Sequence, residues 1–171
     1  MKKNTLLISA LALILGTLSF LWFSSSALNM RPDITLTAID GQKFPLAKMT
    51  GKPILINFWA TSCPSCVEEI PHLTKLYKEL HDDGLEIIGV AMFYDPPLHV
   101  KNFTDQNQLP YPIAIDIQGE AAQAFGDILL TPTNFLIDPN GRIVKKKIGL
   151  MDMHALRQDI LTMLNKPADN L

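Results

Sequence analysis

Residues 54–66 read ILINFWATSCPSC, an apolar run followed closely by a pair of cysteines. The run from Ile54 to Ala60 is rich in β-branched and aromatic residues without alternation, which is typical of a central strand covered on both faces. From Pro64 to Leu80 apolar residues recur at helical spacing, and proline suits the first turn of a helix because its missing N–H is not needed there. The stretch therefore predicts a strand, a short turn and a helix, with the cysteines at the helix N-terminus.

The rest of the chain also contains segments typical of strands and of helices. We expect strands over residues 34–39, 85–93, 113–115, 133–138 and 142–148, helices over 98–107, 119–125 and 153–164, and a connecting piece over 44–49. Strand–helix–strand order favours parallel pairing, and Pro139-Asn140-Gly141 predicts a tight hairpin near the end. The pattern predicts an α/β fold in which a mixed central sheet carries helices on both faces.

The N-terminus has a different composition. Lys2 and Lys3 precede an apolar run, residues 6–23, and no charged residue occurs between Lys3 and Arg31. The run is about as long as the roughly 17–25 residues that span a bilayer and is longer than the apolar part of most signal peptides. We expect a signal-anchor over residues 1–28 and a domain over 29–171. Basic residues stay inside, so the domain would lie in the periplasm or an equivalent space. A cleaved leader, which would release a soluble periplasmic protein, is the alternative.

Length and composition limit the number of domains and the classes of partner. The chain has 171 residues, a formal net charge of −2 and 47% hydrophobic residues. This length suits one domain besides the leader. The absence of a net positive charge argues against nucleic acid as a partner.

The only two cysteines are Cys63 and Cys66. A bridge between residues so close constrains the unfolded chain very little, which favours a chemical role over a structural one. A zinc site would need further ligands, and the four histidines show no paired ligand spacing. Covalent haem attachment needs histidine directly after the second cysteine, where Val67 stands. The pair is therefore interpreted as a redox centre that needs no metal and no cofactor.

The position of the pair predicts its chemistry. A helix N-terminus carries about half a positive charge, and this favours the thiolate, which is the nucleophile in disulfide exchange. We expect Cys63 to be the exposed attacking residue. Cys66, one turn further on, should be more buried and resolve the mixed disulfide.

Residues 57–66 resemble the active-site segment of thioredoxin-like proteins. Lys52-Pro53 before the strand and residues 68–71, EEIP, are similar to the TlpA/ResA-like branch, which includes membrane-anchored reductants of cytochrome c maturation. Thr131-Pro132-Thr133 matches the cis-proline position of the family. The resemblance implies a thioredoxin-like fold and a thiol–disulfide oxidoreductase that acts on disulfide-containing proteins. It also implies a membrane electron donor that reduces the cysteines again.

The resemblance also assigns roles to single residues. Pro132 should be cis and lie against the disulfide, and the backbone of Thr131 should pair with an extended substrate segment. Trp59, beneath the site, and Pro64, between the cysteines, complete the expected substrate-binding set. Glu69 lies one helical turn after Cys66 and could exchange a proton with it; the alternative is a solvated helix glutamate.

Two departures from the family bear on mechanism and specificity. Thioredoxin has a buried aspartate where Asn57 stands, and an amide cannot act as a general base. Ser62 replaces the usual tryptophan before the first cysteine, which removes an aromatic contact surface.

A protein-disulfide reductant is the favoured function. The alternatives are a disulfide oxidase or isomerase, a peroxiredoxin-type antioxidant, and a non-catalytic thioredoxin-like metal chaperone.

Overall fold

The computed structural model describes residues 13–17 and 30–164. Residues 13–17 are helical, and the compact domain begins at Arg31. Over the described residues, no helix is both long and apolar enough to cross a membrane. The leader expected over residues 1–28 lies almost wholly outside the described residues, so the anchor and its boundary remain predictions.

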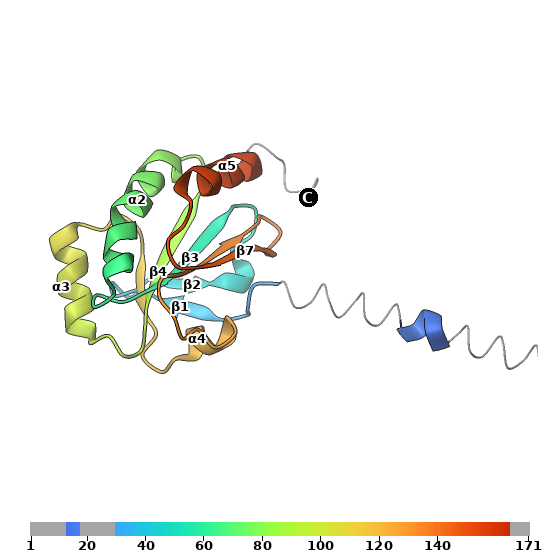
Figure 1. Ribbon diagram of the computed structural model, residues 1–171, viewed down its shortest axis with the longest axis horizontal. Helices are drawn as coiled ribbons and strands as arrows, with labels where there is room; N and C mark the ends of the chain where they lie inside the picture. The colour runs from blue at the N-terminus through green and yellow to red at the C-terminus, as the bar shows by residue number, and fades with distance from the viewer. Residues whose placement is uncertain (1–12, 18–29, 165–171) are drawn as a thin grey trace, which may run out of the picture. The chain divides into compact units, whose positions relative to one another are not determined.

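A five-stranded sheet with the order β5-β4-β3-β6-β7 forms the centre of the domain (Figure 1). Its middle strand β3, Ile54–Trp59, pairs in parallel with β4, Glu86–Ala91, which in turn pairs in parallel with β5, Ile113–Ile115. On the other side β3 pairs antiparallel with β6, Thr133–Ile137, which forms a hairpin with β7, Ile143–Ile148. The predicted mixed sheet is confirmed.

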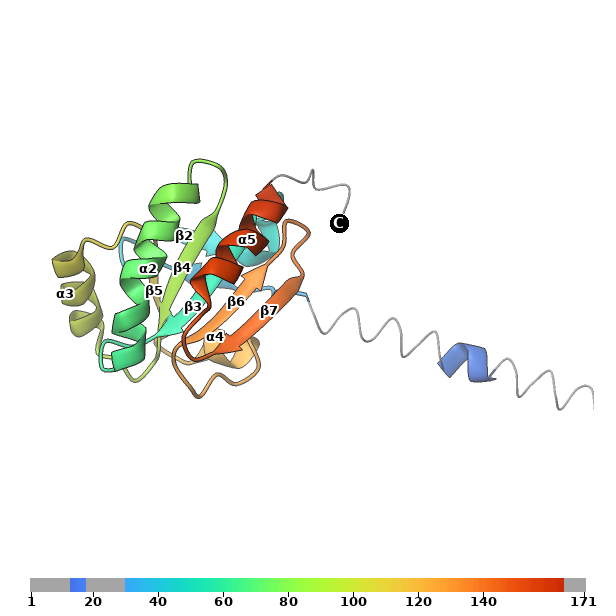
Figure 2. The ribbon, with the colours of Figure 1, turned by 45° about the horizontal axis from the view of Figure 1, so that its top comes forward.

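Helices cover both faces of this sheet. On one face lie α2, Pro64–Leu80, and α5, Met153–Leu164, with α3, Pro97–Asn107, beside them (Figure 2). The other face carries the short helix α4, Glu120–Ala124, and an N-terminal hairpin. These positions confirm the expected thioredoxin-like α/β architecture.

The N-terminal hairpin corrects one detail of the sequence prediction. Its strands are β1, Thr35–Thr37, and β2, Lys43–Pro45, and the 3-10 helix η1, Leu46–Lys48, follows directly. Residues 44–49, expected as a connecting piece, therefore contribute part of a strand. The strand forms because Phe44 is buried opposite Leu36, and it is too short to produce a detectable period.

Side chains of β3 alternate between two apolar cores. Ile54, Ile56 and Phe58 pack on the α4 side, where Phe58 makes edge contacts with Phe125 and Phe135. Leu55 and Trp59 pack against α2 on the opposite side. Full burial of such a side chain contributes about 1.5–3 kcal/mol to folding. Strand alternation places Asn57 on the α2 side as well, as a polar residue within an apolar layer.

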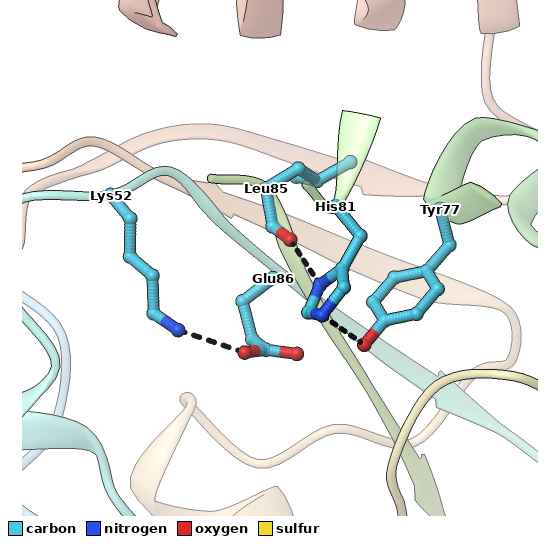
Figure 3. A network of polar contacts seen from close by, with 5 residues as sticks. All are labelled: Lys52, Tyr77, His81, Leu85 and Glu86. Carbon is cyan, nitrogen blue, oxygen red and sulfur yellow. Dashed lines mark hydrogen bonds and ion pairs between the residues drawn. The ribbon is translucent and has the colours of Figure 1, made fainter. Parts of the chain in front are cut away.

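A polar network closes the end of β3 opposite the cysteines (Figure 3). Ile54 of β3 lies opposite Glu86 in the register with β4. The Glu86 carboxylate forms an ion pair with Lys52, in which Nζ and Oε2 are 2.8 Å apart. His81 Nδ1 donates to the Leu85 carbonyl at 3.0 Å, because a carbonyl can only accept. The Tyr77 hydroxyl lies 3.3 Å from Nε2 of the same ring. These contacts link α2 to β4 far along the sheet from the cysteine pair.

Strand β7 forms one edge of the sheet and carries three successive lysines. Lys145 forms an ion pair with Asp159 of α5. Lys146 lies over the ring of Phe135, 5.2 Å from its centroid, on the opposite face. Lys147 is exposed.

Candidate active site

Cys63 and Cys66 form a disulfide at the start of α2, with an S–S distance of 2.20 Å. Cys63 is the N-cap residue of the helix, and its Sγ accepts a 3.2 Å hydrogen bond from the backbone N–H of Cys66. Cys63 is partly exposed, whereas Cys66 is buried with 1% of its surface accessible. The expected difference in exposure between the two sulfurs is confirmed.

The surroundings of Cys63 favour a negative charge on its sulfur. The first turn of α2 holds no acidic residue, so the Cys66 N–H and the positive end of the helix dipole favour negative charge on the sulfur without opposition from that turn. The hydroxyl of Ser65 lies 3.5 Å from Sγ. A thiolate at this position is the attacking form in disulfide exchange.

The peptide bond between Thr131 and Pro132 is cis, as the resemblance to thioredoxin-like proteins implied. The turn is held by Thr133, whose hydroxyl donates to the Leu130 carbonyl at 2.6 Å, and by the Gly149 N–H, which donates to the Pro132 carbonyl at 2.8 Å. The Thr131 hydroxyl lies 3.5 Å from that of Tyr94. Over residues 30–164, none of the backbone hydrogen bonds outside helices and strands involves Thr131, so its backbone is available to a partner.

Glu69 is buried, with 2% of its surface accessible, so the alternative of a solvated glutamate is wrong. Its neighbour Glu68 is exposed. Oε1 of Glu69 accepts a 2.8 Å hydrogen bond from the backbone N–H of Met151. Oε2 accepts from the side-chain amides of Asn57, at 3.2 Å, and Asn134, at 3.0 Å. The carboxylate is thus fixed by groups from three separate parts of the chain.

These three partners of Glu69 are neutral donors. Among the described residues, no lysine or arginine forms an ion pair with it. The negative charge of Glu69 affects the hydroxyl of the buried Tyr111. Burial first, and then the charge of Glu69, raise the pKa of the Tyr111 hydroxyl well above its usual value, although a hydrogen bond with Thr74 opposes this. The carboxylate therefore acts in a poorly solvated layer beneath the active site.

The remaining predicted residues lie around the cysteines in different settings. Pro64 is exposed in the first turn of α2. Trp59 is 1% exposed and packs against Phe103 with ring centroids 5.4 Å apart. This burial favours a supporting role for Trp59, while its predicted contact with substrate stays a prediction. Ser62 is exposed directly before Cys63.

Two residues near the site had no role in the sequence prediction. Asp95 is 3% exposed, and its carboxylate accepts hydrogen bonds from the Thr61 N–H at 2.5 Å and the Thr61 hydroxyl at 2.7 Å. It fixes the turn that leads into Cys63. Asn134 is fully buried within β6. A signal existed for each, because each is a polar residue beside or inside an apolar strand, and Asn134 also directly follows the predicted segment Thr131-Pro132-Thr133.

Fold and site together define the class of this protein, a thioredoxin-like redox enzyme. The chain belongs to the Redoxin family, which its sequence matches over residues 27–164.

Relatives and solved structures agree with this class. The chain is 35% identical to thiol-disulfide oxidoreductase ResA of Bacillus cereus over 159 residues, which cover 87% of this chain and 91% of the relative. It is also 35% identical to the ResA protein of Halalkalibacterium halodurans, over 88% of this chain and 89% of that one. The solution structure of a putative thioredoxin from Neisseria meningitidis superposes with a TM-score of 0.74 and 32% identity, covering 79% of this chain and 89% of that one. Bacillus subtilis StoA gives a TM-score of 0.64 and 28% identity over 73% of this chain and 93% of its own.

Proposed function

We propose that this protein reduces disulfide bonds in protein substrates outside the cytoplasm, with Cys63 as the nucleophile and Cys66 as the resolving residue. The main support is the contrast between the two sulfurs. Cys63 is partly exposed at a helix N-terminus, whereas Cys66 is buried one turn from a fixed carboxylate. The similarity to proteins named thiol-disulfide oxidoreductase ResA supports the same chemistry.

The reaction transfers two electrons from the cysteine pair to the substrate. The Cys63 thiolate attacks one sulfur of the substrate disulfide, and the other substrate sulfur leaves as a thiolate that takes up a proton. The Cys66 thiol loses its proton and attacks the Cys63 sulfur. The Cys63–Cys66 disulfide forms, and the second substrate sulfur leaves as a thiolate. A membrane electron donor then supplies two electrons and reduces the pair.

Glu69 is the proposed acceptor of the Cys66 proton. The two residues are three positions apart on α2, so their side chains lie on one face of the helix. Both are buried, which leaves water little access to the thiol. Asn57 and Asn134, whose side chains contact Glu69 in this layer, are amides and cannot take up the proton.

The substrate would bind along the cis-proline turn. The backbone of Thr131 offers an N–H and a carbonyl to an extended peptide, which would place its disulfide between Cys63 and Pro132. Because main-chain pairing is independent of side chains, many disulfide-containing proteins fit this mode. The resemblance to the TlpA/ResA-like branch favours apocytochrome c, and hence cytochrome c maturation, among them.

The same resemblance, together with the apolar leader, favours a single-pass protein of the bacterial inner membrane with its domain in the periplasm or an equivalent space. Such a compartment keeps thiols oxidised, so a reductant there depends on a dedicated electron supply. An anchor would keep the domain close to a donor within the membrane.

The reduction potential of the Cys63–Cys66 couple tests the direction of electron flow. Full-length protein is equilibrated with dithiothreitol or glutathione buffers, and the reduced fraction is measured by thiol alkylation. A potential near that of thioredoxin, about −270 mV, is expected for a reductant. A potential near about −120 mV would make the protein a disulfide oxidant and overturn the proposed direction. The Cys63→Ser variant controls for alkylation of single thiols.

A further inference from the structure

Asn134 and Asn57 form a closed set of hydrogen bonds with Glu69. Asn134 has no accessible surface and lies opposite Asn57 in the register of β6 and β3. The Asn57 amide donates to the Asn134 Oδ1 at 2.8 Å and to Glu69 at 3.2 Å. The Asn134 amide donates to the same Glu69 oxygen at 3.0 Å.

This arrangement fixes which way Asn134 points. Its Oδ1 is occupied by an N–H from Asn57, so its amide nitrogen must face Glu69. The reverse orientation would set two acceptors, Oδ1 and the carboxylate, against each other in a buried layer, where an unsatisfied polar group costs about 1–3 kcal/mol. Asn57 therefore orients Asn134, and Asn134 presents a donor to the carboxylate.

We infer that Asn134 is a positioning residue for the release of substrate, acting through Glu69. It donates to Oε2 and so holds the carboxylate in one orientation, from which an oxygen can accept the Cys66 proton. This inference rests on the role proposed above for Glu69. Asn134 follows Pro132 by two positions, so the turn that would bind substrate leads directly into the strand that carries the group orienting the proton acceptor.

Other groups belong to the elements that contribute to this layer or to segments next to them. Cys66 comes from the same helix as Glu69, and Tyr111 lies in the segment before β5. Lys147 pairs with Asn134 across β6 and β7, which puts both side chains on one face of the sheet. Met151 contributes only its backbone N–H, and Asp152 follows it. Lys147 is the charged residue paired with Asn134 across the strands. The variant Lys147→Met therefore removes a charge beside Asn134 without changing the hydrogen bonds to Glu69, and it serves as the control.

The test separates the two chemical steps with Ellman's reagent. Reduced full-length protein releases one thionitrobenzoate when Cys63 attacks and a second when Cys66 resolves the mixed disulfide. In Asn134→Leu we expect the first step to keep its rate and the second to slow by about 5- to 20-fold at pH 7, within the 10²–10⁴ that proton transfer can contribute. Lys147→Met should keep the ratio of the two rates.

A double-mutant cycle with Glu69→Gln decides whether Asn134 acts through Glu69. We expect Glu69→Gln to slow the second step, and Asn134→Leu to slow it no further in that background. An additive loss, or an unchanged second step in Asn134→Leu alone, would overturn the inference while leaving the role of Glu69 intact. An unchanged second step in Glu69→Gln would remove Glu69 from the mechanism, and the inference with it. Asn134→Ser, which is smaller and places its hydroxyl out of reach of Glu69, replaces Asn134→Leu in the cycle if the leucine variant does not fold.

Discussion

Asn57 and Asn134 lie directly opposite each other on β3 and β6, and a 2.8 Å hydrogen bond joins their side-chain amides. The first strand leads to Cys63, and the second follows Pro132. One buried bond therefore links the strand before the nucleophile to the strand after the cis-proline. Because both amides also donate to Glu69, the two strands and α2 meet at a single carboxylate.

The assignment of the two cysteines predicts which variant traps a substrate. In Cys66→Ala the exposed Cys63 still attacks, but nothing releases the mixed disulfide, so covalent adducts should accumulate. They would be detected as reducible bands on non-reducing gels after exposure to extracytoplasmic proteins. Cys63→Ala is the matched control and should form few adducts. If Cys63→Ala is instead the variant that accumulates adducts, the two roles are reversed.

The three donors around Glu69 predict a stability difference between neighbouring glutamates. In Glu69→Gln the new NH₂ group meets a donor in either orientation, the asparagine amides on one side or the Met151 N–H on the other, and we expect a loss of about 1–3 kcal/mol in the free energy of unfolding. Glu68→Gln makes the same chemical change at an exposed position and should stay within about 0.5 kcal/mol. Urea unfolding of the oxidised proteins compares them. Equal losses would mean that the carboxylate contacts contribute no net stability.

Asp95 predicts a link between the β4–α3 loop and the reactivity of Cys63. Asp95→Asn replaces one acceptor of Thr61 with a donor, so the turn before the cysteine should loosen at a cost of about 1–3 kcal/mol. We expect the rate of Cys63 alkylation in the reduced protein to change several-fold. Asp105→Asn, at an exposed position on α3, should leave this rate unaltered. An unchanged alkylation rate in Asp95→Asn would show that the turn keeps its position without these bonds.

The network in Figure 3 predicts an alkaline loss of stability. Burial first, and then the charge of Glu86, raise the pKa of Tyr77 to about 12. The native protein therefore retains a proton that the unfolded chain releases near pH 10. The associated stability is complete below about pH 10 and is lost as the pH rises through about 12.

Tyr77→Phe should accordingly flatten the fall of the urea midpoint above about pH 10. Part of the slope should remain, because the pKa of Tyr111 is raised as well. The exposed Tyr94 provides the control variant Tyr94→Phe, which should keep the whole slope. An equally steep fall in Tyr77→Phe would place the alkaline transition elsewhere.

Elements with a strong local pattern could be predicted from the sequence. The predicted bounds of α2 and α5 agree with the structure, because proline and apolar spacing mark the first and an amphipathic period marks the second. The hairpin strand β2 was missed. Three residues that end in Pro45 carry no period, and only pairing with β1 makes them a strand.

Pro132 and Thr131 were placed at the site by the family resemblance, but spacing alone predicted the site only where its residues are close in sequence. The spacing of Cys63, Cys66 and Glu69 follows from one helix. The partners of Glu69 do not, since Asn134 is 65 positions away and Met151 is 82. Their approach depends on the register of β6 against β3 and on the path of the chain after β7. Asp95 likewise reaches Thr61 from 34 positions away.

The lysines of β7 bear on how the protein avoids associating with its own substrates. An unfolded chain that carries disulfides also offers extended segments, and an open sheet edge is a template on which such segments can add as strands. Lys145, Lys146 and Lys147 lie on that edge, and bringing a further strand against it would crowd and desolvate their charges. The lysines thereby disfavour pairing of a substrate segment with the main chain of β7, whereas the backbone of Thr131 is still able to pair with it. A client would then be bound briefly beside the nucleophile and would not nucleate an aggregate on the enzyme that serves it.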